Sequence, residues 1–321
     1  MTKPLVYITR TISNELLKQY EENFRVKMWE SEDTPVPRDV LLKEIAEADG
    51  LLCMLSDTID AEVMEHGKHL KVIANLAVGY NNIDLQTAQA HSIVVTNTPD
   101  VLTETTADLT FALLMATARR IVEASDYIRE DQWEDWSPFL LAGADIHHQT
   151  IGIVGMGRIG EAVARRARGF GMNVLYHNRS RKAVAENELQ AEYVSFDDLL
   201  HRSDFIVPLA PLTDETEEMF DADAFEKMKE SAIFINASRG QVVNEDALYE
   251  ALSTKKIAAA GLDVFTVEPI RSNNRFVALD NTVCLPHIGS SSVKTRTEMV
   301  HLCCENIVAV FQGEAPKTPI T

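Results

Sequence analysis

The chain has 321 residues, of which 45% are apolar, a composition that excludes fibrous and disordered proteins and a length that suits two domains. It carries 49 acidic and 30 basic residues, and the net charge of −19 argues against binding to nucleic acid or to anionic membranes. No apolar run approaches the ~20 residues of a membrane-spanning helix. The four cysteines lack metal-ligand spacing, so we expect reduced thiols, no metal and a cytoplasmic location.

The first hundred residues alternate between short β-rich runs and helical patterns, which indicates a parallel sheet covered by helices. The predicted strands are Leu5–Ile8, Gly50–Leu55, Val72–Ala77 and Ile93–Thr96, and the predicted helices include Asp39–Ala48 and Asp84–Ala90. A helix from Val101 to Ile121 follows, because a period of 3.6 continues there without a breaker. Residues 129–149 have no clear period and are predicted to form a loop.

From Thr150 the alternation restarts more strongly. The predicted strands are Ile151–Val154, Asn173–Tyr176, Asp204–Pro208, Ala232–Asn236, Ile257–Leu262 and Val283–Leu285. A terminal helix is expected from about Ser291 to Gln312. The pattern therefore predicts an α/β protein with two doubly wound parallel-sheet domains.

A glycine-rich turn follows the first strand of the second half. Gly155, Gly157 and Gly160 form G-x-G-x-x-G between an apolar strand and a helix. In such a turn the first glycine permits the sharp bend, the second lets a pyrophosphate approach, and the third allows close helix packing. The helix N-terminus offers free N–H groups to the anion. A dinucleotide site is the favoured interpretation, and a purely structural turn is the alternative.

The next strand ends without the carboxylate that usually binds the adenosine ribose of NAD. Asn178, Arg179, Ser180 and Arg181 stand there instead. Arginines bind a 2′-phosphate through charge-assisted hydrogen bonds, so we predict NADP as the preferred cofactor, with NAD possible. The alternative is a solvated basic loop.

Three later strands are each followed by a polar residue. Arg239, Glu268 and His287 should converge, because the carboxyl ends of parallel strands meet at one edge of a sheet. Separately, they could be a turn residue, a surface carboxylate and a core histidine. Together with the glycine turn, they indicate an active site.

The chain resembles the D-isomer-specific 2-hydroxyacid dehydrogenases over essentially its whole length. The resemblance rests on the segment from Asn75 to Asp84 and on four motifs in family order, namely GMGRIG, NASRG, GLDVF with Glu268-Pro269, and LPHIGS. It is most similar to the glyoxylate/hydroxypyruvate reductase branch, which includes bacterial 2-ketogluconate reductases. The resemblance implies hydride transfer from NADPH to a small 2-oxo acid, giving the D-2-hydroxy acid.

The resemblance also implies site residues. Arg239, Glu268 and His287 would be catalytic: His287 donates the proton, Glu268 orients it, and Arg239 grips the substrate carboxylate. The expected substrate-binding residues are Leu55, Val78, Gly79, Arg239 and Ser290. The expected cofactor-binding residues are Gly155, Met156, Gly157, Arg158, Ile159, Gly160, Asn178, Arg179, Ser180, Arg181, Ala237, Ser238, Asp263, His287 and Gly289, with Asp263 on the nicotinamide carboxamide.

The resemblance further implies a domain division, a homodimer and a substrate range. Residues 101–287 would form a Rossmann cofactor domain, and residues 1–100 with 288–321 a discontinuous, flavodoxin-like substrate domain. Leu140 aligns with a tryptophan of animal hydroxypyruvate reductases that reaches across the dimer, which favours a roomier pocket for longer acids such as 2-ketogluconate.

Two alternatives stay open. One is a nucleotide-sensing scaffold of the same fold, although no appended tail follows the terminal helix. The other is a related oxidising dehydrogenase, such as phosphoglycerate dehydrogenase, which the missing ribose carboxylate disfavours.

Overall fold

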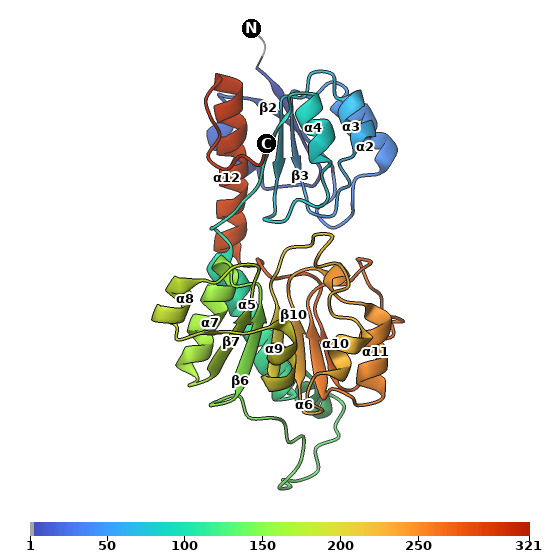
Figure 1. The fold of residues 1–321 in the computed structure, drawn as a ribbon. Coiled ribbons are helices and arrows are strands. Elements are labelled where there is room, and N and C mark those ends of the chain that lie inside the picture. The colour runs from blue at the N-terminus through green and yellow to red at the C-terminus, as the bar shows by residue number, and fades with distance from the viewer. Residues whose placement is uncertain (1–2) are drawn as a thin grey trace. The chain divides into compact units, whose positions relative to one another are not determined.

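The computed structural model describes residues 3–321 and divides the chain into two compact units (Figure 1). The first unit contains the residues up to Leu102 together with Ser292–Thr321. The second contains Thr103–Ser291. Each unit is built on its own parallel sheet, so the predicted fold class of two α/β domains is confirmed.

The first unit has a five-stranded parallel sheet in the order β2-β1-β3-β4-β5. Its strands are β1 (Leu5–Ile8), β2 (Arg25–Met28), β3 (Gly50–Cys53), β4 (Val72–Asn75) and β5 (Val94–Thr96). Its helices are α1 (Asn14–Leu17), η1 (Lys18–Tyr20), α2 (Arg38–Ile45), α3 (Ala61–His66), α4 (Leu85–Ala90) and α12 (Val293–Gln312). The order 2-1-3-4-5 is that of flavodoxin-like sheets, in agreement with the prediction.

Strand β2 was not predicted from the sequence. Its residues, RVKM, alternate between exposed and half-buried positions, because the strand lies at the edge of the described sheet and pairs with β1 on one side. The central strands β3 and β4 are instead buried at every position. A continuous apolar run marks a buried parallel strand, whereas a short edge strand lacks that signal.

The second unit has a seven-stranded parallel sheet in the order β12-β11-β10-β9-β6-β7-β8. Its strands are β6 (Thr150–Val154), β7 (Asn173–His177), β8 (Glu192–Tyr193), β9 (Phe205–Pro208), β10 (Ile233–Asn236), β11 (Ala259–Leu262) and β12 (Thr282–Cys284). Its helices are α5 (Thr103–Ala118), α6 (Ile121–Arg129), α7 (Arg158–Gly169), α8 (Ala183–Glu188), α9 (Phe196–Arg202), α10 (Ala222–Glu226), η2 (Gly240–Val242) and α11 (Glu245–Ser253). The direction of strand order reverses between β6 and β9, which is where doubly wound sheets bind ligands.

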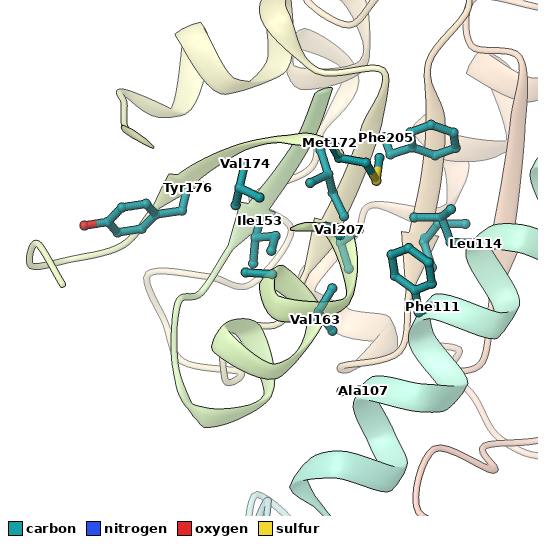
Figure 2. Close-up of a cluster of buried hydrophobic side chains, with 14 of the residues drawn as sticks. Ala107, Phe111, Leu114, Ile153, Val163, Met172, Val174, Tyr176, Phe205 and Val207 are labelled. Atoms are coloured by element: carbon teal, nitrogen blue, oxygen red, sulfur yellow. The ribbon is translucent and has the colours of Figure 1, made fainter. Parts of the chain in front are cut away.

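Each face of this sheet has its own apolar core. One core lies under α5 and α7 and includes Phe111, Val163 and Phe205 (Figure 2). The other lies under α9, α10 and α11 and includes Phe225 and Phe234. Because both faces are covered, the polar side chains of this sheet can gather only beyond the strand ends.

The predicted helix from Val101 to Ile121 is in fact shorter and is followed by a second helix. Helix α5 ends at Ala118, and Arg120 adopts a left-handed backbone before α6 begins. The Ala144 N–H donates a hydrogen bond of 2.8 Å to the Ala118 carbonyl, and a Cβ at Gly143 would clash with that carbonyl. A loop distant in sequence therefore caps α5, so local periodicity carries no signal of the break.

Within residues 3–321 no helix combines the length and hydropathy needed to cross a membrane. Across the same residues no group of three metal-ligating side chains comes together. The cysteines are free thiols, and those of Cys53, Cys303 and Cys304 are buried.

Candidate active site at the carboxyl edge of the second sheet

The glycine-rich turn lies directly after β6, at the point where the strand order reverses. Gly155 has φ +104°, and a side chain there would clash with the backbone of Ala210. A Cβ at Gly160 would clash with the Gly155 carbonyl, whereas the space around Gly157 is open. The turn is therefore tight on its protein side and open on the other, which fits a cradle for a pyrophosphate at the N-terminus of α7.

The side chains between these glycines differ in their burial. The Met156 side chain is fully buried, and Ile159 packs against the same apolar cluster, so both side chains belong to the core. Arg158 is exposed on the first turn of α7.

The two arginines of the loop after β7 have different environments, a difference that the sequence alone does not predict. Arg181 pairs with Glu186, with 3.0 Å from Nε to Oε1 and 2.7 Å from Nη2 to Oε2. Arg179 is exposed, and in the described part of the chain its side chain has no hydrogen bond or ion pair. The Asn178 side chain donates to the Ser180 carbonyl at 3.0 Å, which stabilises the turn between them.

Arg239 follows β10 on a turn that the Asn236 side chain stabilises by hydrogen bonds. Asn236 is buried, and its Oδ1 accepts from both the backbone N–H and the hydroxyl of Ser238, at 3.0 and 2.8 Å. Its Nδ2 donates to the Arg239 carbonyl at 2.9 Å. Burial lowers the pKa of the Arg239 guanidinium from its ordinary value, and the negative charge of Glu268 acts in the opposite direction. The cation is thus held in a partly desolvated place near a carboxylate.

Glu268 and His287 form the central pair of the site. The distance from His287 Nδ1 to Glu268 Oε2 is 2.8 Å, and Glu268 Oε1 accepts from the Phe265 N–H at 2.9 Å. Burial raises the pKa of Glu268, but the bonds to His287 and Phe265 and the charge of Arg239 together lower it below its ordinary value. His287 has φ +55°, a left-handed conformation that costs of order 1–3 kcal/mol and recurs at functional sites.

Asp263 follows β11 and is fully buried. Its Oδ1 accepts from the Ile288 N–H at 2.8 Å, whereas Oδ2 is buried and has no hydrogen-bond partner among residues 3–321. Burial raises the pKa of this carboxyl. A buried oxygen without a donor is costly, and an amide N–H from a ligand would satisfy it. Gly289 lies beside it, since a Cβ there would be 3.4 Å from Oδ2.

The structure therefore brings together the predicted residues of the second unit at one sheet edge. Three further predicted residues of this unit are half-buried. Ala237 and Ser238 directly precede Arg239, and Ser290 lies three residues after His287. Leu55, Val78 and Gly79 belong to the first unit, where they follow the neighbouring strands β3 and β4.

The turn that contains Val78 and Gly79 is also held by asparagines. The Asn75 side chain donates to the Gly79 carbonyl at 2.9 Å, and the Asn97 side chain donates to the Val78 carbonyl at 2.8 Å. No role was assigned from the sequence to these asparagines, to Asn236 or to Glu186, although Asn75 and Asn236 lie in the quoted motifs. Asn75 and Asn236 share a position at the last residue of a buried strand, which is the signal that could have found them.

Comparison with known proteins identifies the class. Residues 111–289 match the family described as D-isomer specific 2-hydroxyacid dehydrogenase, NAD binding domain. A glyoxylate reductase of Korarchaeum cryptofilum is 48% identical over 315 residues, which cover 98% of this chain and 95% of that protein. A crystal structure of a Thermus thermophilus protein has a TM-score of 0.92 and 42% identity, covering 99% of this chain and 100% of that one.

A further structure, of the NADPH-dependent glyoxylate/hydroxypyruvate reductase of Sinorhizobium meliloti in complex with NADP and malonate, has a TM-score of 0.85 and 31% identity. It covers 100% of this chain and 97% of that one. The fold and the site define a nicotinamide-dependent oxidoreductase. The chain belongs to the D-isomer specific 2-hydroxyacid dehydrogenase family.

Proposed function

We propose that the protein reduces a small 2-oxo acid to the D-2-hydroxy acid with NADPH. Glyoxylate is the first substrate to test, because the similar proteins of Korarchaeum cryptofilum and Pyrococcus horikoshii are glyoxylate reductases. Hydroxypyruvate and 2-ketogluconate are the further candidates. The observation that carries the proposal is the hydrogen bond between His287 and Glu268, with Arg239 near them, at the same sheet edge as the glycine-rich turn.

The proposed roles follow from the chemistry of these groups. His287 donates a proton to the carbonyl oxygen through Nε2, because Nδ1 is engaged by Glu268. Glu268 orients the imidazole, and its lowered pKa keeps it ionised for that role. Arg239 binds the substrate carboxylate and polarises the carbonyl. The resemblance also assigns main-chain N–H groups of Val78 and Gly79 to the substrate carboxylate, and Leu55 and Ser290 to the lining of the substrate.

The residues present fit a nicotinamide dinucleotide. The turn from Gly155 to Gly160 would hold the pyrophosphate, and the unpartnered Oδ2 of Asp263 would accept from the nicotinamide carboxamide. The segments Ala237–Ser238 and Asn178–Arg181 and the residue Gly289 would complete the cofactor site. The reduced nicotinamide supplies the hydride when it is bound.

The preference for NADP rests on the loop after β7. No carboxylate follows β7 to accept from a ribose 2′-hydroxyl, and Arg179 is exposed with its side chain uncommitted among residues 3–321. A 2′-phosphate would find a cation there, so we propose that NADPH is used in preference to NADH, while NADH remains a substrate.

We further propose that the protein acts in the cytoplasm as a homodimer. Large apolar side chains are exposed in one sequence segment, among them Ile128 on α6 and Trp136 and Phe139 in the following loop, at 58%, 75% and 85%. Exposed aromatic groups of this kind favour a protein–protein interface. Light scattering of the wild type and of the double variant Trp136→Ser/Phe139→Ser tests this, and a monomeric wild type would refute it. The free thiols agree with a reducing compartment.

The test of function measures the fall in NADPH absorbance with glyoxylate, hydroxypyruvate and 2-ketogluconate, each repeated with NADH. We expect turnover with at least one acid and a higher kcat/KM for NADPH than for NADH. Faster turnover with NADH would refute the cofactor preference alone. Tight dinucleotide binding without turnover of any acid would refute the reductase and favour a nucleotide-sensing role.

A further inference from the structure

Glu186 on α8 is the centre of a small polar cluster beside the end of β7. Its carboxylate makes the bidentate ion pair with Arg181 described above and also accepts from the Tyr176 hydroxyl, with 2.6 Å between Tyr176 Oη and Glu186 Oε1. The bonds to Arg181 and then to Tyr176 lower the pKa of Glu186 to about 2. The carboxylate is therefore charged at neutral pH.

Two tyrosines fix this cluster to the sheet. The Tyr176 ring is buried in the apolar core of β7, and its hydroxyl points away from that core (Figure 2). The same hydroxyl accepts from the Lys182 N–H at 2.7 Å. Tyr193 on β8 donates to the Asn178 carbonyl at 3.2 Å, and the Arg181 guanidinium lies 5.7 Å from the centre of its ring. Arg181 is thus held by a carboxylate and an aromatic face together.

The strand that carries Tyr176 is bonded at its end to the dinucleotide-binding turn. The Gly155 N–H donates to the His177 carbonyl at 2.9 Å, which joins the first glycine of the turn to the last residue of β7. A nucleotide bound at the turn therefore places its ribose near the loop that starts at Asn178. Glu186 lies on the helix that follows this loop, and it brings a negative charge to the one place where a 2′-phosphate would need positive charge.

We propose that Glu186 is a specificity-determining residue that engages Arg181 and thereby weakens the preference of the protein for a 2′-phosphate. Arg179 then supplies the main uncommitted cation, and Arg181 contributes little because its charge is balanced. This arrangement would keep NADH usable in a chain that has no ribose carboxylate after β7. The inference rests on the proposed use of NADPH, and it adds the residue that limits that preference.

The test measures binding of two fragments by calorimetry, adenosine 2′,5′-bisphosphate and adenosine 5′-monophosphate, so that turnover is not needed. The variants are Glu186→Gln, Arg181→Ala and the double variant, with Glu188→Gln as the matched control. Glu188 lies on the same helix, is exposed, and its side chain has no hydrogen bond or ion pair within residues 3–321. Glu186→Gln keeps an acceptor for Tyr176, and the melting temperature of each variant shows that the fold is intact.

We expect Glu186→Gln to bind the bisphosphate about three- to fivefold more tightly at low salt, the scale of one exposed charge pair, and the monophosphate unchanged. Arg181→Ala alone leaves the Glu186 carboxylate unpaired, so it should weaken bisphosphate binding by a similar factor, and the double variant should return to the affinity of the wild type. Glu188→Gln should lack the gain. Weaker or unchanged binding in Glu186→Gln would overturn the inference, because Glu186 would then position Arg181 for the phosphate or play no part. A gain that survives in the double variant would also overturn it.

The same binding experiment also tests the proposed preference for NADP. If the wild type does not prefer the bisphosphate over the monophosphate, and Arg179→Ala has no effect, the proposed preference for NADP fails. The coupling between Glu186 and Arg181 is still measured in that case, so the two failures are distinguishable.

Discussion

Two places at the same sheet edge of the second unit are built in different ways. Arg239 follows the buried strand β10 and His287 follows the half-buried strand β12, and hydrogen bonds with Asn236 and Glu268 fix them. Arg179 and Arg181 belong to an exposed loop, where one cation is uncommitted and the other is paired. The rigid strand ends are suited to catalysis, because the reacting groups tolerate little displacement. The exposed loop is suited to cofactor recognition, because its affinity can change by small steps. Changes at the strand ends should therefore act on kcat, and changes in the loop on cofactor affinity.

The largest effect is expected at His287. His287→Ala removes the proton donor, and kcat for reduction should fall by about 10²- to 10⁴-fold, the usual contribution of general acid catalysis. The measurement is the steady-state rate with NADPH and glyoxylate. His201→Ala is the matched control, because His201 is exposed on α9 and, within residues 3–321, its ring bonds to the Asp197 carbonyl alone. A fall below tenfold would exclude His287 as the proton donor.

Arg239 comes next. Arg239→Ala should lower kcat/KM for glyoxylate by about 10²- to 10³-fold, because a preorganised donor to the reacting carboxylate and carbonyl is lost. Arg239→Lys should recover only part of the loss, since a lysine cannot reproduce a bidentate contact. Dinucleotide affinity, measured by fluorescence titration, should be nearly unchanged. Full recovery by lysine would contradict a bidentate role.

Glu268→Gln should have a smaller effect on rate, roughly tenfold at neutral pH. The carboxylate holds the ring through its bond to His287 Nδ1, and a neutral amide holds it less firmly, so kcat should fall more than KM for glyoxylate rises. Steady-state kcat and KM check this, with Glu250→Gln on α11 as the exposed control. A kcat equal to that of the wild type would rule out Glu268 as the group that positions His287.

Glu268→Gln should also change the free energy of unfolding, and the sign of its pH dependence follows from the pKa of Glu268. The pKa of Glu268 is below its ordinary value of 4.5 in the folded protein. Its ionised form therefore stabilises the fold above pH 4.5, and this contribution is lost as the pH falls through the lower folded value. The difference in unfolding free energy between wild type and Glu268→Gln should shrink toward acid pH in urea titrations. A difference that grows toward acid pH would contradict the lowered pKa.

The smallest effect is expected in the loop. Arg179→Ala should raise KM for NADPH by about tenfold, the scale of one charge-assisted hydrogen bond, and should leave KM for NADH and both kcat values unchanged. Arg168→Ala is the control, since Arg168 is exposed at the opposite end of α7 and pairs with Gln190. An equal rise for both cofactors would show that Arg179 does not read the 2′-phosphate.

The difference between buried strands and exposed segments also explains which features the sequence could predict. Buried strands such as β6 and β10 have continuous apolar runs, so the sheets and the residues at their ends were predictable. The exposed edge strand β2 and the end of α5 at Ala118 were not, because edge pairing and a cap from Ala144 leave no local pattern. The bonds of Glu186 to Arg181 and to the Tyr176 hydroxyl were not predictable either, because they form only in the packed structure.

The division between chemistry and recognition is tested most directly by a single-turnover rate with saturating NADPH and glyoxylate, measured for the wild type, Arg179→Ala and His287→Ala. We predict that Arg179→Ala reaches the wild-type rate once the cofactor is saturating, whereas His287→Ala stays slower by at least about 10²-fold. A slow Arg179→Ala at saturation, or a His287→Ala that recovers, would contradict this division.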